Sequence, residues 1–402
     1  MSSSAGQEAR PTGGPGRRRV LGAFAAAAAL AAVPTSAVAN TAPISRSPVP
    51  AGPRAAGRPL YLGTYTSQQG GGTGVGLATY DGTTGAVTAG GTLTGVANPS
   101  YLAVHPDGTT LYAVDEQQDG AVTAIALPTD GGSPSVLGSR SAGGAGPTHL
   151  SVHPSGRWLL SADYTSGSVA VHPIDTTGAL GEATDVVQHS APAPGPGQDG
   201  PHAHQIVTSP DGGHVLAVDL GNDTVYTYRL DESAGTLSQV SYATLRPGAG
   251  PRHLTFHPSG AYAYLANELD NTVVVCGYDP QSGELTPGEP QSTGAGGAGS
   301  SFPAELLVTA DGAFAYLANR GHNSLTRYAV EADGAELRLL DTVPVGGDYP
   351  RQIAFSPDGG LLFAANQNSG TVTVFHVDLA TGELASAGDP FPSPVAVCAL
   401  PL

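Results

Sequence analysis

The chain repeats itself about every 50 residues, and this constrains its fold more than any other feature. Each repeat contains a tight turn such as His-Pro-Ser-Gly or Ser-Pro-Asp-Gly, in which proline presets φ and glycine accepts a positive φ. The second residue of this turn, here called the turn marker, is Pro106, Pro154, Pro210, Pro258, Ala310 and Pro357, at spacings of 48, 56, 48, 52 and 47 residues. Such a period, with several short strands in each repeat, is typical of the blades of a β-propeller.

The two ends of the chain supply half a repeat each. Leu60 to Thr66 matches the second strand of a repeat, and Val395 to Leu400 matches a first strand. Pairing these strands in one blade would close the ring and leave no exposed sheet edge. The sequence therefore predicts an all-β, seven-bladed β-propeller over residues 59–402, closed by its N- and C-terminal strands.

The first 39 residues have the features of an export signal. Three arginines, Arg17–Arg19, precede an apolar run from Val20 to Val33 that is too short to span a bilayer, and Ala37–Ala39 fits a small-residue cleavage site. We therefore expect a twin-arginine-type signal peptide over 1–39, a disordered linker over 40–58, and a protein exported to the cell envelope or the medium.

Composition narrows the classes of partner. The formal net charge is −17, and all 16 basic residues are arginines, which argues against nucleic acid or an anionic membrane as partner. We expect a monomer without a membrane span that binds a small molecule. Cys276 and Cys398 lie in different repeats and are expected to be buried free thiols, although an exported protein could also pair them. No Cys/His cluster has zinc spacing, so neither a metal nor another cofactor is expected.

Six segments, in order along the chain, carry a family resemblance. They are YLGTYTS, NPSYLAVHPDGTTLYAVDE, PHAHQ followed by VDLGND, GPRHLTFHPSGAYAYLANEL, AYLANRGHNS and PRQIAFSPDGGLLFAANQ. Together they resemble the lactonase family of seven-bladed propellers, which includes 6-phosphogluconolactonases and carboxymuconate cyclases. The resemblance implies a site made of His204 in PHAHQ, Arg252 in GPRH, Glu268 in ANEL and Arg320 in ANRGH. Members act on different lactones, so the resemblance does not identify the substrate.

The repeat register points to the same residues independently. The first strand of a propeller blade lines the central channel, so the residues six before and ten after the marker should face one mouth of a central funnel. The residues six before are Ser100, Thr148, His204, Arg252, Ala304 and Arg351, and those ten after are Glu116, Tyr164, Leu220, Glu268, Arg320 and Gln367. Three of the nine arginines after Pro59 fall on these twelve positions. Charges that converge on an axis must be paired or functional, so the alternative to a site is a ring of salt bridges between blades.

Other polar residues near the funnel have more ordinary explanations. His149 and His253 lie one residue off the register and are expected to brace neighbouring blades. Asp219 and Glu305 are expected to bind blade backbones through hydrogen bonds. The Pro/Gly-rich segment 191–200, just ahead of His204, is either a lid over the funnel or a disordered loop.

The charged residues suit the opening of a lactone. Hydrolysis of this ring ester needs a base for water, a proton donor for the departing oxygen, and positive charge near the oxyanion. We assign Glu268 as the base, His204 as the acid, and Arg252 with Arg320 as the charge stabilisers, without a metal; the first two roles can also be exchanged. The expected substrate-binding residues are Arg351, Glu116, Gln367, Tyr164 and His202. The hypothesis is a lactonase for a sugar lactone, as in 6-phosphogluconolactonases. The alternatives are a carboxymuconate-type lactonising cycloisomerase and a non-catalytic ligand-binding propeller at the cell surface.

Overall fold

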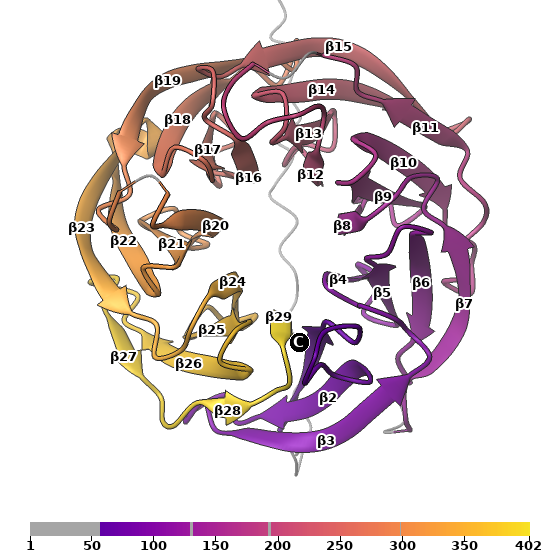
Figure 1. Cartoon of the computed structure of the whole chain (residues 1–402), viewed down its shortest axis with the longest axis vertical. Helices are drawn as coiled ribbons and strands as arrows, with labels where there is room; N and C mark the ends of the chain where they lie inside the picture. Colours follow the sequence, from indigo (N-terminus) through magenta and orange to yellow (C-terminus); the bar gives the residue numbers. More distant parts are fainter. Residues whose placement is uncertain (1–56, 129–131, 192–193, 298) are drawn as a thin grey trace, which may run out of the picture. The chain divides into compact units, whose positions relative to one another are not determined.

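Seven β-sheets are arranged in a ring in the computed structural model of the protein (Figure 1). The structure describes residues 57–128, 132–191, 194–297 and 299–402. These residues contain no α-helix and one 3-10 turn, η1 (Ala332–Gly334), and none of them forms a helix long and apolar enough to cross a membrane. The predicted all-β, seven-bladed propeller is confirmed. The expected signal peptide and all but the end of the expected linker lie outside the described residues.

Six blades follow one another along the chain, each built from an inner strand outward. The first two blades are β4 (Leu102–Val104), β5 (Thr110–Asp115), β6 (Ala121–Ala126) and β7 (Ser135–Ser141), and then β8 (Pro147–Val152), β9 (Trp158–Asp163), β10 (Ser168–Pro173) and β11 (Asp185–Gln188). The next two are β12 (Ala203–Thr208), β13 (Val215–Asp219), β14 (Thr224–Asp231) and β15 (Thr236–Thr244), and then β16 (Pro251–Phe256), β17 (Tyr262–Asn267), β18 (Thr272–Tyr278) and β19 (Leu285–Ser292). The last two are β20 (Phe302–Val308), β21 (Phe314–Arg320), β22 (Ser324–Glu331) and β23 (Glu336–Pro344), and then β24 (Pro350–Phe355), β25 (Leu361–Asn366) and β26 (Thr371–Val377), with β27 (Leu384–Ser386) and β28 (Phe391–Pro392) both paired to β26.

The seventh blade joins the two ends of the propeller. Its order is β29 (Ala396–Pro401), β1 (Arg58–Thr64), β2 (Gly74–Tyr80) and β3 (Val87–Thr94), with β29 innermost (Figure 1). β29 and β1 are antiparallel, and Leu60 lies opposite Pro401. The ring is therefore closed by the pairing that the half-repeats predict.

The inner hairpins turn where the markers stand. Between β16 and β17, His257 and Tyr262 close the turn with a backbone hydrogen bond of 2.9 Å, and Gly260 adopts a φ of 73°, which glycine tolerates. The His257 ring lies 2.8 Å from the Ser259 hydroxyl through its Nδ1 atom. This turn histidine is therefore structural.

Apolar side chains pack between neighbouring blades. One cluster joins Leu216 and Val218 of β13 to Leu254 of β16 and Leu265 of β17, all nearly inaccessible to solvent. Cys276 belongs to the same cluster and Cys398 lies on β29, and both are buried free thiols, as predicted. Burial raises the pKa of both thiols to about 12, so neither is a reactive thiolate at neutral pH.

The ladder between the two inner strands contains a β-bulge in six of the seven blades. The skipped residues are Thr148, His204, Arg252, Arg351 and Val397, with Ala304 and Glu305 sharing the bulge in β20. Five of them stand six residues before a turn marker. A bulged residue is left unpaired by the ladder and its side chain is re-aimed, so this irregularity presents the predicted site residues at the end of each inner strand.

Candidate active site

A repeated backbone hydrogen bond fixes the open end of each inner hairpin. The residue ten after the marker donates its N–H to the carbonyl of the residue eight before it, as from Glu268 to Gly250 at 2.7 Å. The equivalent pairs are Glu116 with Asn98, Tyr164 with Gly146, Leu220 with His202, Gln367 with Tyr349, and, in the closing blade, Tyr65 with Val395. Because this bond recurs, the side chains six before and ten after the marker occupy equivalent places in successive blades, as the register predicts.

Glu268 is shared by two buried arginines. Its Oε2 atom lies 3.1 Å from Arg252 Nε and 2.6 Å from Arg320 Nη2. The arginine side chains are 2% and 4% exposed and the glutamate 19%. Arg320 also donates to the carbonyls of Phe302 and Pro303, at 3.2 and 3.1 Å. We call Arg252, Glu268 and Arg320 the triad.

The charges of the triad shift one another's pKa values. Burial alone would raise the pKa of Glu268, but the adjacent Arg320 and Arg252 outweigh burial and lower it, so the carboxylate is ionised at neutral pH. Burial and the nearby Arg320 lower the pKa of Arg252 to about 9, which leaves it a cation at neutral pH. Two positive charges thus face one negative charge, and the triad carries an excess positive charge that an anion could share.

His204 lies beside the triad as a neutral imidazole. It is 5% exposed, and its ring is 5.6 Å from Tyr164 and 5.1 Å from His253 between centroids. Burial, followed by the charge of Arg252 and other cations, lowers its pKa well below the usual value. Its Nδ1 atom has no hydrogen-bond partner within the described residues. A neutral histidine with an unpartnered nitrogen can accept a proton.

A second ion pair faces the same centre from other blades. Arg351 Nη2 lies 4.0 Å from Glu116 Oε2, which also accepts a 2.8 Å hydrogen bond from the Tyr65 hydroxyl. The guanidinium carbon of Arg351 lies 5.5 Å from the centre of the Tyr65 ring. Burial alone would lower the pKa of Arg351, but Tyr65, Glu116 and Glu268 together raise it. Arg351 is therefore a permanent cation, and 17% of its side chain is exposed.

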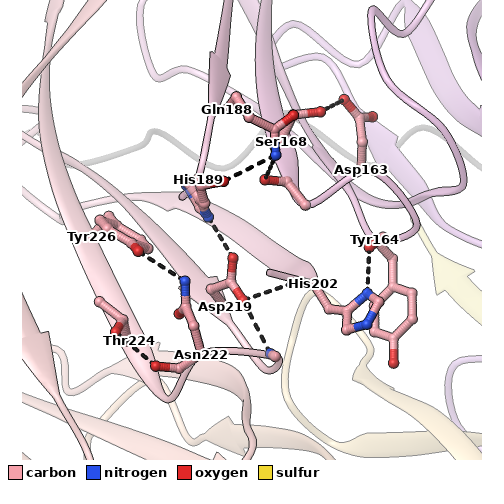
Figure 2. A network of polar contacts seen from close by, with 12 residues as sticks. Asp163, Tyr164, Ser168, Gln188, His189, His202, Asp219, Asn222, Thr224 and Tyr226 are labelled. Carbon is pink, nitrogen blue, oxygen red and sulfur yellow. Dashed lines mark hydrogen bonds and ion pairs between the residues drawn. The ribbon is translucent and has the colours of Figure 1, made fainter. Parts of the chain in front are cut away.

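Tyr164 and His202 form a stacked aromatic pair. Their ring centroids are 4.4 Å apart at 18°, and His202 Nδ1 lies 2.8 Å from the Tyr164 carbonyl oxygen. Figure 2 shows how Asp219 holds this pair: its carboxylate accepts the backbone N–H of His202 at 2.8 Å and lies 2.6 Å from His189 Nδ1. Asp219 therefore binds blade backbone, as expected. His202 Nε2 is 2.7 Å from Asp199, so both ring nitrogens have protein partners and a direct contact with substrate stays a prediction.

Gln367 and two tyrosines complete the central residues. The Oε1 atom of Gln367 is buried and has no hydrogen-bond partner among the described residues. Tyr65 matches Glu268 in register but is not predicted from the sequence, because the closing blade has no turn marker from which to count. Tyr349 is not predicted either; its ring lies 5.4 Å from Arg320 and its φ of 65° is unusual for a bulky residue.

Two off-register residues behave differently from one another. His149 Nδ1 lies 3.4 Å from the backbone N–H of Ile206 in the next blade, which is the bracing role expected. Glu305 does not have its expected backbone hydrogen bonds: its Oε2 atom lies 3.0 Å from His253 Nδ1 and has no hydrogen-bond partner within the described part of the chain. The bulge in β20 explains the difference, because it breaks the alternation that would have kept Glu305 in the ladder.

Metal-binding side chains are not grouped in the part of the chain that the structure describes. No three His, Cys, Asp or Glu side chains there are placed to hold one ion. Glu268 and Glu116 are turned toward arginines.

Comparison with known proteins places this architecture in a family. A family model described as "Lactonase, 7-bladed beta-propeller" matches residues 59–401. The 6-phosphogluconolactonase of Bacillus subtilis is 33% identical over 291 residues, which cover 71% of this chain and 82% of that protein. The periplasmic gluconolactonase of Pseudomonas aeruginosa has 31% identity and a TM-score of 0.79, over 86% of this chain and 99% of that one. A Lactobacillus plantarum protein has 35% identity and a TM-score of 0.80, over 86% and 99%. The resemblance seen in the sequence is confirmed, and the chain belongs to the lactonase family of seven-bladed β-propellers.

Proposed function

We propose that the protein hydrolyses a sugar lactone by acid/base catalysis in its central funnel, without a metal ion. The observation that carries the proposal is the triad beside His204: one carboxylate shared by two buried arginines, next to a neutral imidazole. The names of the relatives in Bacillus subtilis and Pseudomonas aeruginosa support a lactone as substrate.

The contacts favour His204 for both proton-transfer roles, with Glu268 as a positioning group. Both residues are weak bases, because arginines lower the pKa of Glu268 and burial together with Arg252 lowers that of His204. Glu268 Oε2 is also occupied by two guanidinium groups, whereas one ring nitrogen of His204 has no partner among the described residues. His204 therefore takes the proton from water as the water oxygen bonds to the lactone carbonyl carbon. Arg252 and Arg320 stabilise the oxyanion, and Glu268 holds both guanidinium groups in place. When the ring C–O bond breaks, the proton returns to the departing oxygen, and the products are a hydroxyl and a carboxylic acid, which then releases its own proton to solvent at neutral pH.

The remaining central residues bear on the choice of lactone. Arg351 can hold a carboxylate or phosphate substituent, because it stays charged and is partly exposed. Tyr164 offers an aromatic face to the sugar ring. A phosphorylated sugar is a cytoplasmic metabolite, so the expected export signal favours an unphosphorylated or carboxylated lactone as the natural substrate.

A panel of lactones tests the proposal directly. Residues 40–402 are assayed with glucono-δ-lactone, its 6-phosphate and a carboxylated γ-lactone, with spontaneous hydrolysis subtracted. We expect an open hydroxy acid as product, and we expect Glu268→Gln and His204→Ala each to lower kcat by about 10²-fold or more. His376→Ala, in the third strand of its blade, is the control and should keep full activity.

Two other results would favour the alternatives. An unsaturated diacid as product would identify a cycloisomerase. Folded wild-type protein that opens no lactone would leave a ligand-binding propeller.

A further inference from the structure

A second ring of mostly polar side chains lies one residue deeper than the candidate site. Its members each stand five residues before a turn marker, or at the equivalent place on β29: Tyr101, His149, Gln205, His253, Glu305, Gln352 and Cys398. We call them the floor ring. All but Tyr101 are no more than 6% exposed. Propeller interiors are usually filled by side chains, but this filling is unusually rich in groups that can carry a proton.

Two members of the floor ring, Glu305 and His253, connect it to His204 of the site. Glu305 Oε2 lies 3.0 Å from His253 Nδ1, and the His253 ring is 5.1 Å from the His204 ring between centroids. These residues come from β20, β16 and β12 in turn. Titratable groups in contact thus run from His204, beside the triad, inward to a buried carboxyl group; neither contact is a hydrogen bond, so each transfer needs a turn of the His253 ring.

The path retains unused hydrogen-bonding capacity. Glu305 Oε2, both ring nitrogens of His253 and His204 Nδ1 have no hydrogen-bond partner within the described residues. A buried polar atom without a partner is destabilising, so an apolar floor would give a more stable propeller. The path is therefore poorly explained as packing.

We propose that His253 and Glu305 form a proton relay behind His204, in which Glu305 holds the catalytic proton while the lactone ring opens. This rests on the proposed hydrolysis. His204 accepts the proton of the attacking water at one nitrogen and releases a proton from the other toward His253, which passes one to Glu305. As the ring C–O bond breaks, the same transfers run backward and the proton ends on the departing oxygen, so no proton is gained or lost by the protein.

The charges around the path explain why a proton would leave His204. Arg252, Arg320 and Arg351 all disfavour its imidazolium form, and the same arginines disfavour that of His253. Burial raises the pKa of Glu305 to about 7, a value at which it can both accept and return a proton near neutrality.

The groups that face Glu305 from neighbouring elements leave it as the residue best able to hold the proton. Two of them, His149 of β8 and Arg252 of β16, lower its pKa but do not cancel the effect of burial. The others are His253 of β16, Tyr101 ahead of β4 and Cys398 of β29. Arg320 of β21 and Arg351 of β24 act on its neighbour His253.

The first test uses Glu305→Gln, which keeps shape and removes the proton acceptor. We expect kcat to fall by on the order of 10²-fold with KM unchanged, and the limb of the kcat–pH profile near pH 7 to disappear. Glu305→Asp should restore part of the rate and the limb. Glu331→Gln makes the same chemical change at an exposed position and should alter neither. Thermal unfolding should show Glu305→Gln to be at least as stable as wild type, because a buried carboxyl group becomes a neutral amide.

A second test does not depend on turnover. Infrared difference spectra across about pH 5 to 9 should show one buried carboxyl group titrating in wild type and absent in Glu305→Gln. Nitrogen NMR of labelled histidines should show His253 and His204 responding to that step. Wild type that hydrolyses no lactone would remove the proposed function, while the spectra would still decide whether the three groups share a proton. A wild-type kcat and pH profile in Glu305→Gln, or no carboxyl titration in this range, would overturn the relay.

Discussion

Replacing Glu268 by glutamine should weaken the fold as well as the activity. The change removes the only negative charge in the triad and leaves two guanidinium groups, 2% and 4% exposed, without their shared partner. Removing one partner of a buried ion pair typically costs 3–5 kcal/mol. Glu268 is 19% exposed, so solvent screens part of the loss, and we expect the free energy of unfolding to fall by about 2–4 kcal/mol.

Urea unfolding at pH 7 measures this loss, with Glu331→Gln as the matched control. Glu331 pairs with Arg338 at the surface, where the side chains are 43% and 57% exposed, so its loss should cost less than about 1 kcal/mol. The pH dependence has a definite sign. The pKa of Glu268 is lowered in the folded state, so its stabilisation is present above the unfolded-state value, near 4.3, and is lost as pH falls through the folded-state value. The difference between wild type and variant should therefore narrow below about pH 4.

A double-mutant cycle measures the electrostatic coupling between Glu268 and Arg320. The double variant Glu268→Gln/Arg320→Gln should lose less stability than the sum of the two single variants. Glu268→Gln leaves the Arg320 cation unpaired, and Arg320→Gln removes that cation. Strict additivity, or a loss for Glu268→Gln no larger than that of the surface control, would refute the view that the triad is electrostatically coupled.

Three further predictions concern the ring, the metal and export. Deleting residues 394–402 removes β29 and should cost about 5 kcal/mol or more, because several fully buried side chains leave; an unchanged unfolding midpoint would contradict ring closure as a source of stability. A chelator should leave lactone hydrolysis unaffected, and activity lost to chelation and restored by one divalent ion would overturn the metal-free mechanism. Mature protein recovered outside the cytoplasm should begin at Asn40, and replacing Arg17 and Arg18 by lysine should retain the precursor inside; secreted protein with an intact N-terminus would contradict the signal.

The repeat was sufficient to predict the fold and much of the candidate site. Counting from the turn marker located Arg252, Glu268 and Arg320, because hairpin geometry brings residues at fixed distances from a turn to the same edge. It could not show that both arginines share one carboxylate oxygen, because their approach depends on side-chain conformations across two blades.

Residues outside that count were harder to find. Tyr65 belongs to a hairpin assembled from the two ends of the chain, and no turn joins its strands. Glu305 was assigned an ordinary role because strand alternation alone does not reveal the bulge in β20. Irregular backbone, which a period-two pattern cannot describe, is therefore where the prediction was least complete.

The bulges have a consequence for how such a protein could be modified. A side chain at a bulge is not needed by the ladder, so replacing it leaves the hydrogen bonds of the blade in place. Each of the six bulged blades therefore presents a side chain beside the axis that can be exchanged without loss of the blade's own ladder. Three of the bulges hold a small or apolar residue, namely Thr148, Ala304 and Val397. They are the places where a designer could install a new contact and redirect the propeller to a different ring, while the blades themselves stay as they are.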